Sequence, residues 1–410
     1  MSYEKLSKIF YKLDAADYMH EYHTRVSGYG SYVTGLSINA FKRGRTTEDS
    51  FELFYVNTPR LMDLHSEVLL NSSKIASLVA KLPQFAVEPY FHKLIINEAQ
   101  STNEIEGVKS TKKELSDALD DIMKSESGHK RFIGLMKTYL HIEDIEPFEE
   151  LQSFRDLYDE LVADEISSDN TPDGDMFRKG YVEVNDGSVT THIGVRTEMR
   201  IRTNLEKLIA YLQDPSHPDL YKYMVAHYYY EYTHPFYDGN GRTGRLLVGS
   251  YLARYLDPYT AISLSYAVNK NKTKYYKALE EVAAPLNRGD LTFFLIDMLE
   301  LLASGQQGVI DDLEDNLVKL THIKQNISDE TWAENKLEKQ LLYVIITMNV
   351  FIHEDTEVSM SILRKVSGES RYLINKSMAS LIKHEYVEVV SKNPKTYRLD
   401  REFLETILPV

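Results

Sequence analysis

The sequence predicts a mainly α-helical fold that contains one β-hairpin within its helical core and a small module of helices and strands at its C-terminus. Apolar residues recur with helical spacing through most of residues 59–305, which favours helices packed around a shared core. Residues 181–193 break this pattern, because two alternating stretches flank the turn-forming sequence Asn-Asp-Gly-Ser. After residue 335, three helical stretches precede two short strands.

With 410 residues, the chain is long enough for two or three domains. Short apolar alternations from Ser31 onward indicate an arm with a hairpin, to which the sequence assigns no chemistry. Gly107 ends a helix, and the capping-box spacing of Thr111 and Glu114 begins the next one. The expected segments are an N-terminal arm (1–58), a helical N-terminal region (59–125), a helical core (126–308), a linker (309–335) and a C-terminal domain (336–410).

Composition excludes several classes of protein and site. Without cysteine, the chain cannot form disulfides, thiolate nucleophiles or cysteine-ligated metal centres. A net charge of -15 disfavours broad nonspecific binding to nucleic acid, although it is compatible with a locally basic module. The first residues carry charges where a signal peptide is apolar, and no segment of membrane-spanning length is free of charge. We therefore expect a cytoplasmic protein without a membrane partner.

The chemistry is concentrated in residues 234–245, which read His-Pro-Phe-Tyr-Asp-Gly-Asn-Gly-Arg-Thr-Gly-Arg. This stretch separates two helical segments, so it forms a loop that leads into the N-terminus of a helix. Gly239, Asn240 and Gly241 allow tight backbone turns whose free N–H groups, together with the helix dipole, bind an anion. The expected ligand is a phosphate group.

Charged side chains in this loop extend the prediction to a polyphosphate. Arg242 and Arg245 are three residues apart, so they lie on one face of the helix and reach the same anion. Asp238 would repel phosphates unless a divalent cation lay between them, and such oxygen ligands suit Mg²⁺. His234 can accept a proton near neutral pH, so it is our candidate general base for a hydroxyl nucleophile.

Four other interpretations of the loop are weaker. Taken singly, each residue fits a glycine-rich turn with surface arginines. The loop matches neither a Walker phosphate loop nor a dinucleotide-binding fingerprint that follows a strand. A di-iron bundle needs two Glu-x-x-His pairs, and we find one, formed by Glu231 and His234.

The loop resembles the signature of Fic-domain adenylyltransferases, His-Pro-Phe-x-acid-Gly-Asn-Gly-Arg-x-x-Arg, at all eight fixed positions and at the acidic one. Less specific similarity covers residues 59–304. The resemblance implies a Fic-type helical core with a β-hairpin flap. Glycine at position 241, where the phosphorylating Doc-like relatives typically have lysine, favours nucleotidyl over phosphoryl transfer.

The resemblance also implies a role for each residue of the loop. ATP would supply AMP, His234 would deprotonate a protein hydroxyl, and Asp238 would hold Mg²⁺. Residues 239–241 would hold the α-phosphate, while Arg242 and Arg245 would bind the outer phosphates. These roles agree with those that the residue types indicate.

Two further regions are similar to parts of the same family. Residues 271–279 resemble its adenine-side helix, which implies that Tyr275, Tyr276 and, in the following turn, Asn287 line the base pocket. Tyrosine pairs are also ordinary core residues. The hairpin 181–193 is similar in position to the flap, which aligns a target segment by strand pairing, and open hairpin edges suit that role. A hairpin that lies passively on the domain fits the sequence equally well.

Residues 102–107, Thr-Asn-Glu-Ile-Glu-Gly, resemble the family's inhibitory motif, which begins at Thr102. Glu106 closes a helix just before Gly107, where the helix dipole disfavours a carboxylate unless a cation compensates. The resemblance supplies Arg245 as that cation. We therefore expect Glu106 to draw Arg245 away from the γ-phosphate, and an exposed terminal glutamate is the alternative.

The C-terminal domain differs from the rest of the chain in charge. Residues 358–398 contain eight Lys or Arg and three Glu, whereas the whole chain is acidic. Three helices followed by a hairpin describe a winged helix-turn-helix domain, whose third helix and wing could contact DNA phosphates. Winged helices act equally often as protein-interaction modules, so DNA and protein are alternative partners.

We therefore predict a protein adenylyltransferase (AMPylator) that uses ATP and Mg²⁺ to modify a Tyr, Thr or Ser hydroxyl of a target protein, or of itself, and that Glu106 inhibits. The same site suits AMP removal or the transfer of another nucleotide. A winged-helix transcription regulator whose Fic core senses nucleotide is the alternative from a different class. The complete set of catalytic positions favours the enzyme, and a homo-oligomer is compatible with both hypotheses.

Overall fold

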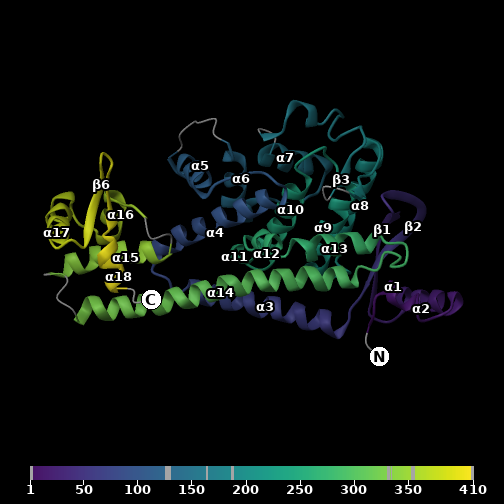
Figure 1. Cartoon of the computed structure of the whole chain (residues 1–410), viewed down its shortest axis with the longest axis horizontal. Coiled ribbons are helices and arrows are strands. Elements are labelled where there is room, and N and C mark those ends of the chain that lie inside the picture. The colour runs from purple at the N-terminus through teal and green to yellow at the C-terminus, as the bar shows by residue number, and fades with distance from the viewer. Residues whose placement is uncertain are drawn as a thin grey trace. The chain divides into compact units, whose positions relative to one another are not determined.

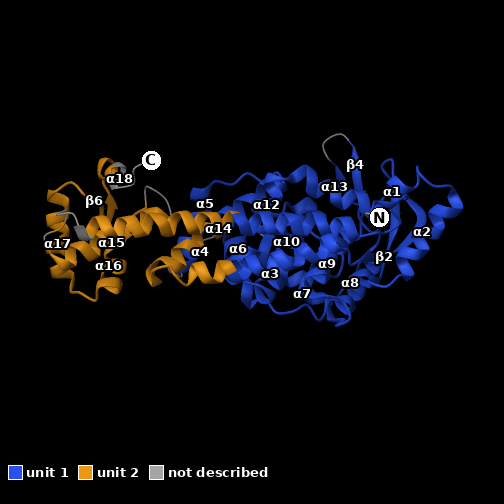
Figure 2. Cartoon of the chain, turned by 90° about the horizontal axis from the view of Figure 1, so that it is seen from below, with its two compact units in different colours: residues 1–73, 95–307 blue, residues 74–94, 308–410 orange. Residues whose placement is uncertain are grey.

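The computed structural model describes residues 3–124, 131–162, 165–185, 189–329, 333, 335–351 and 356–407. They form two compact units, which Figure 2 shows in different colours. Unit 1 comprises residues 1–73 and 95–307, and unit 2 comprises residues 74–94 and 308–410. Three helices have residues in both units: α3 (Pro59–Val79), α4 (Gln84–Ile105) and α14 (Thr292–Asp329). The fold is mainly helical with small β-hairpin sheets (Figure 1), which confirms the predicted class.

The interior of unit 1 is built on α9 (Asp219–Thr233) and α10 (Asn240–Tyr255). The loop between them, residues 234–239, begins the sequence signature and is called the motif loop below. All of residues 240–253 are buried, and a helix buried on every side needs neighbours on every face. Helix α7 (Leu151–Val162) packs on α10, and α8 (Glu198–Gln213) packs on α9. The remaining helices of this unit are α1 (Leu6–Ile9), α2 (Ala15–Ser27), α5 (Lys112–Lys124), α6 (Ile133–Leu140), α11 (Pro258–Ala261), α12 (Leu264–Lys270) and α13 (Lys272–Ala283).

The N-terminal arm is a long antiparallel hairpin of β1 (Ser31–Lys42) and β2 (Arg45–Val56). Arg43 and Gly44 both have positive φ values, 51° and 74°, as a two-residue hairpin loop requires. Buried and exposed side chains alternate along β1, so one face of the hairpin packs on the protein. Phe54 near the end of β2 exchanges two backbone hydrogen bonds, of 3.2 and 2.8 Å, with the turn before α14. The arm is therefore an integral part of unit 1.

Local signals fix the end of α4. Gly107 has a positive φ of 72°, so it ends the helix as predicted. Helix α5 begins at the predicted capping box, in which the Glu114 N–H donates to Thr111 Oγ1 (3.2 Å) and the Thr111 N–H donates to the Glu114 carboxylate (2.8 Å). Glu106 therefore lies between the last residue of α4 and the glycine that ends this helix.

The predicted hairpin in the core is formed by β3 (Glu183–Asn185) and β4 (Thr190–Ile193), and its turn residues 186–188 lie outside the described residues. It makes a two-stranded sheet of its own. The hairpin does not stand alone among helices, however, because the ring of His192 lies 6.4 Å from that of Phe41 in the arm. The arm therefore supports one side of the hairpin.

Unit 2 contains the C-terminal domain. Its helices after α14 are α15 (Lys336–Phe351), α16 (Met360–Ser367), α17 (Arg371–Lys383) and α18 (Arg401–Ile407), and its strands are β5 (Val358–Ser359), β6 (Val387–Lys392) and β7 (Lys395–Leu399). The strand order is β5–β7–β6. The short β5 was too brief to predict from alternation, and the predicted linker 309–335 is helical as far as Asp329.

Helix α14 is the one helix among the described residues that is long and apolar enough to cross a membrane by length and composition. Inside the protein, 61% of its apolar window is buried. It lies beside α3, because Gln306 donates to the Val68 carbonyl (3.0 Å) and Arg60 pairs with Glu300 (2.6 Å). These contacts and this burial are those of a core helix.

Candidate active site

The motif loop is held in one conformation from within. His234 ends α9 with a left-handed backbone conformation (φ 51°), which turns the chain out of the helix. The side chain of Asn240 closes the loop, because Oδ1 accepts from the Phe236 N–H (2.9 Å) and Nδ2 donates to the Phe236 carbonyl (2.8 Å). Phe236 is fully buried and stacks on Tyr158 at 3.7 Å between ring centroids. The loop is therefore preformed.

His234 is held as a neutral imidazole. Its Nδ1 lies 3.3 Å from the Glu231 carbonyl, which assigns the proton to Nδ1 and leaves Nε2 as a proton acceptor. Burial, together with smaller contributions from His192 and Arg178, lowers the pKa of His234 to about 3. The side chain is thus in the form that a general base requires at neutral pH.

The start of α10 forms an anion site. The N–H of Thr243 makes the first intrahelical bond, to the Gly239 carbonyl (3.0 Å), so the N–H groups of residues 240–242 precede the helical pattern. Gly239 has a φ of 82°, and a Cβ there would lie 2.9 Å from Val162, so this position requires glycine. Asp238 accepts the Gly239 N–H through Oδ1 (2.6 Å), which holds its exposed carboxylate beside this site.

Arg242 pairs with a carboxylate that the sequence analysis did not identify. Its Nη1 donates to Glu165 Oε2 at 2.9 Å, and only 2% and 7% of the two side chains are exposed. Burial raises the pKa of Glu165, and the charge of Arg242 opposes that effect. The Nε of Arg242 is buried and has no hydrogen-bond partner within the described part of the chain. The pair therefore fixes the guanidinium through one nitrogen.

Arg245 is enclosed by the predicted inhibitory motif. Its Nη2 lies 2.7 Å from Glu106 Oε1, its Nε donates to Thr102 Oγ1 (3.0 Å), and its Nη2 also donates to the Thr102 carbonyl (3.2 Å). Burial lowers the pKa of Arg245, but the charge of Glu106 and its neighbours outweighs burial and raises it. A Cβ at Gly241 would clash with the Glu106 carboxylate, which therefore lies against the N-terminus of α10.

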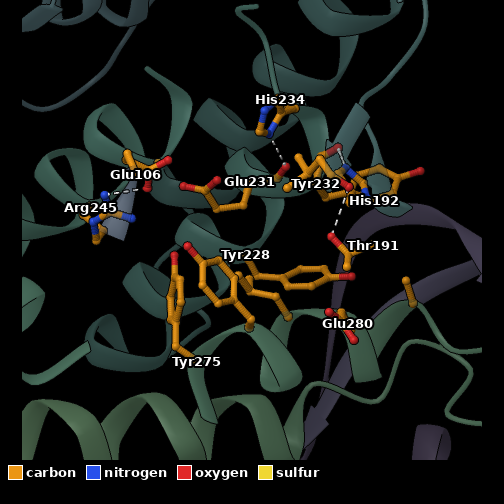
Figure 3. A pocket seen from close by; sticks show the side chains of 15 residues that line it. Glu106, Thr191, His192, Tyr228, Glu231, Tyr232, His234, Arg245, Tyr275 and Glu280 are labelled. Atoms are coloured by element: carbon orange, nitrogen blue, oxygen red, sulfur yellow. Dashed lines mark hydrogen bonds and ion pairs between the residues drawn. The ribbon is translucent and has the colours of Figure 1, made fainter. Parts of the chain in front are cut away.

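Glu106, His234 and Arg245 line a cavity of about 120 Å³ (Figure 3), whereas Asp238 and Arg242 are not among the residues that line it. Gly241 at the start of α10 also lines it, as do Thr191 and His192 of the flap strand β4. Two of the predicted base-pocket residues, Tyr275 and Tyr276 of α13, also line the cavity.

Asn287, the third predicted base-pocket residue, lies outside the cavity. Its side chain accepts the N–H of Ser7 (3.1 Å) and donates to the Glu281 carbonyl (2.7 Å), so it ties the N-terminal arm to the end of α13. The Tyr275 hydroxyl bonds His227 (2.9 Å), whereas the Tyr276 hydroxyl donates to the carbonyl of Ile105 (3.2 Å), the last residue of α4.

Sequence reasoning missed two positioning residues besides Glu165. Arg178 is fully buried and donates to the carbonyls of His234 (2.8 Å), Gly180 (2.6 Å) and Val195 (2.9 Å), which joins the motif loop to both ends of the flap. Its sequence neighbours carry no pattern that marks such a role. His192 could have been noticed as a histidine on a predicted strand. Its ring centroid lies 6.2 Å from that of His234.

A family model described as Fic/DOC family matches residues 147–252. Solved structures to which the chain is similar include a Fic family protein from Desulfovibrio desulfuricans G20, with 17% identity and a TM-score of 0.49 over 88% of this chain and 98% of that one. A Fic domain containing signaling protein from Bacteroides thetaiotaomicron VPI-5482 has 18% identity and a TM-score of 0.41 over 62% and 96%. A fragment of Fic-1 from C. elegans has 16% identity and a TM-score of 0.43 over 63% and 74%.

The matched residues include the flap hairpin, α9, the motif loop and most of α10. Members of this family typically transfer nucleotide-derived groups onto proteins. Residues 147–252 of the chain therefore form a Fic/DOC family domain.

Proposed function

We propose that the chain is a protein adenylyltransferase, which transfers AMP from ATP to a hydroxyl group of a protein. The observation that carries this proposal is a neutral His234 beside a preformed anion site that two buried arginines flank. A nucleoside triphosphate suits such a site, because its α-phosphorus can lie near the base while cationic groups bind its outer phosphates.

In this reaction, Nε2 of His234 accepts the proton of the target hydroxyl. The hydroxyl oxygen then forms a bond to the α-phosphorus, the bond from that phosphorus to the β-phosphate breaks, and pyrophosphate leaves. The N–H groups of residues 240–242 stabilise the charge on the α-phosphate, and Arg242 and Arg245 stabilise the leaving group. The Glu231 carbonyl on Nδ1 keeps the imidazole in the correct tautomer.

Asp238 is the proposed protein ligand of Mg²⁺. Its exposed carboxylate is fixed through one oxygen beside the anion site, and carboxylate and phosphate oxygens are the ligands that Mg²⁺ prefers. When bound, the ion would neutralise charge on the phosphates.

The Glu106–Arg245 pair supports autoinhibition. The guanidinium that would bind the γ-phosphate already bonds a carboxylate and the Thr102 backbone and side chain. For the target, we propose an extended segment that lies along the flap hairpin 181–193, because β4 lines the cavity that contains His234. A segment of another copy, or of the chain itself, is compatible with this arrangement.

The test is intact-mass measurement after incubation with ATP and Mg²⁺. We expect an AMP adduct on the Glu106→Gly variant, less on the wild type, and none on Glu106→Gly with His234→Ala. An adduct that persists without His234 would show that another site acts. No adduct on Glu106→Gly, either on itself or on proteins of a cell extract, would reject AMP transfer.

We also propose that residues 336–410 form a winged-helix domain that binds double-stranded DNA. Three helices surround a sheet of order β5–β7–β6, and Arg371, Lys376 and Lys392 are exposed on its third helix and wing. Lys395 instead donates to Asn375 (2.8 Å), which joins wing to helix. Fluorescence anisotropy should show binding that weakens steeply between 50 and 200 mM salt and that Arg371→Ala with Lys376→Ala abolishes. Equal binding by this double variant would refute DNA contact through this face.

A further inference from the structure

The cavity contains a buried carboxyl group to which the proposed reaction gives no role. Glu231 lies one helical turn before His234 and lines the cavity, with 12% of its side chain exposed. Its Oε1 is buried and has no hydrogen-bond partner among the described residues. The Nδ1 of His227 is 4.0 Å away, too far for a hydrogen bond, and lies 3.2 Å from the Gly244 carbonyl. A buried polar atom without a partner costs about 1–3 kcal/mol, so its presence beside a cavity points to a ligand.

Two glycines allow this carboxyl group to lie against α10. A Cβ at Gly244 would clash with the Glu231 carboxyl group, just as a Cβ at Gly241 would clash with Glu106. Gly241 and Gly244 are three residues apart, so both lie on one face of the helix. Figure 3 shows Glu231 pointing toward the pair of Glu106 and Arg245, which are 2.7 Å apart. Two carboxyl groups therefore approach one face of α10, and one of them is bonded to the arginine.

Of these two carboxyl groups, that of Glu231 is the protonated one. Burial raises the pKa of Glu231 to about 8, Arg245 opposes this rise and Glu106 adds to it. At neutral pH Glu231 can therefore donate a hydrogen bond, and it has no charge that would repel a phosphate. His227 on α9 lies 4.0 Å away. The titratable or charged groups that line the cavity with Glu231 are Glu106 after α4, His192 on β4, Tyr228 and Tyr232 on α9, His234 after α9, Arg245 on α10, and Tyr275, Tyr276 and Glu280 on α13.

We propose that Glu231 is a nucleotide-binding residue whose carboxyl group donates a hydrogen bond to a phosphate oxygen of the nucleotide in this cavity. This inference rests on the proposed function, which supplies the nucleotide. The acceptor is a phosphate because the neighbour of Glu231 is Arg245, the cation assigned to the outer phosphates. Phosphate charge favours the protonated form of the carboxyl group, so binding at alkaline pH takes up a proton from solution.

Calorimetric titration measures this uptake directly. ATP with Mg²⁺ is titrated into the His234→Ala protein, which prevents turnover, at pH 8.5 in two buffers of different ionisation enthalpy. We expect an uptake of roughly three quarters of a proton, the ionised fraction for a group with a pKa of about 8. Adding Glu231→Gln should abolish the uptake and preserve affinity, because the amide donates without ionising. Adding Glu231→Ala should weaken binding at pH 7 about tenfold.

Glu206→Gln, at an exposed position of α8, is the matched control and should change neither the proton uptake nor the affinity for ATP. Circular dichroism shows whether each variant is folded. Unchanged proton uptake in Glu231→Gln would overturn the inference and leave ATP binding intact, as would full affinity in Glu231→Ala. An absence of ATP binding in the His234→Ala parent would instead reject the proposed function and this inference with it.

Discussion

The two arginines of α10 each lie against a glutamate from elsewhere in the chain, but the two pairs leave different donors accessible. Arg245 bonds both Glu106 and Thr102, so most of its donors are occupied. Arg242 uses Nη1 for Glu165, and its Nε has no partner within the described residues. We infer that the first pair withholds an arginine from the nucleotide, whereas the second positions one for it.

If Glu106 withholds Arg245, its removal should activate the enzyme. Glu106→Gly should form AMP adduct at least about tenfold faster than the wild type, because one charged hydrogen bond is worth about 1.5–3 kcal/mol. Glu104→Gly is the matched control, since it removes an exposed carboxylate and introduces glycine in the same last turn of α4. Equal rates for the two variants would mean that a weakened helix end, and not the carboxylate, causes the activation.

If Glu165 positions Arg242, its neutralisation should impair the enzyme. Glu165→Gln in the Glu106→Gly background should lower kcat/KM for ATP about tenfold, because Arg242 loses its charged anchor in a buried setting. Glu160→Gln removes an exposed partner of Lys137 and should have little effect, as surface pairs contribute about 0–1 kcal/mol. An increase in kcat/KM for Glu165→Gln would identify Glu165 as a second inhibitory residue.

At the scale of the element, α4 and the residue that follows it present three polar side chains at a spacing of four residues. Glu98, Thr102 and Glu106 therefore lie along one face, and the last two hold Arg245. The Glu98 carboxylate accepts the N–H groups of Ser265 (2.8 Å) and Tyr266 (3.0 Å) at the start of α12. Helix α4 is thus joined to α10 and α12 through one stripe of polar contacts.

This stripe predicts the effect of a substitution far from the cavity. Glu98→Ala should lower the free energy of unfolding by about 2–4 kcal/mol, because the buried N–H of Ser265 and the part-buried N–H of Tyr266 lose their acceptor. Urea denaturation followed by circular dichroism measures the loss. Glu88→Ala, at an exposed position of the same helix, should cost less than about 1 kcal/mol. A similar loss from both variants would argue against the contact with α12.

The elements that the sequence could predict are those whose signals are local. The capping box of Thr111 and Glu114 and the two strands of the flap each involve residues close together in the sequence, and both structures are present. The motif loop is equally local, which is why its residues could be assigned roles. Contacts across the chain have no such spacing: Glu165 lies 77 residues from Arg242, and only the fold brings them together.

The same reason explains the base pocket. Tyr275 and Tyr276 are neighbours on one helix, and both line the cavity as predicted. Asn287 lies beyond the end of that helix, where the N-terminal arm binds its side chain. A contact between residues 280 positions apart leaves no mark in either segment.

At the scale of the whole molecule, unit 1 buries titratable groups with opposite effects on stability. Burial lowers the pKa of His192 to about 4, and of His227 and His234 to about 3. Burial raises the pKa of Glu98 to about 7 and of Glu231 to about 8. The histidines therefore limit stability on the acidic side, and the glutamates limit it on the alkaline side.

The sign of each effect follows from which state binds more protons. As the pH falls below the ordinary histidine value of about 6.5, the unfolded chain takes up protons that the folded chain excludes, so the free energy of unfolding decreases. As the pH rises from about 4.5 to between 7 and 8, the folded chain keeps the protons on Glu98 and Glu231 that the unfolded chain has released, so the free energy of unfolding also decreases with rising pH. The two opposing trends overlap, and for these groups they balance slightly below neutral pH, where the maximum of stability is expected.

Substitution of a single buried histidine isolates its contribution to the loss of stability at acidic pH. Between pH 7 and pH 5, each buried histidine lowers the free energy of unfolding by about 2 kcal/mol, the value for a group that is protonated only in the unfolded state. His227→Gln should therefore lose about 2 kcal/mol less stability over this interval than the wild type, as measured by urea denaturation at both pH values. His20→Gln, at an exposed position of α2, should leave the pH dependence unchanged. Parallel losses in His227→Gln and the wild type would mean that His227 is protonated in the folded protein, which its burial and the charge of Arg245 argue against.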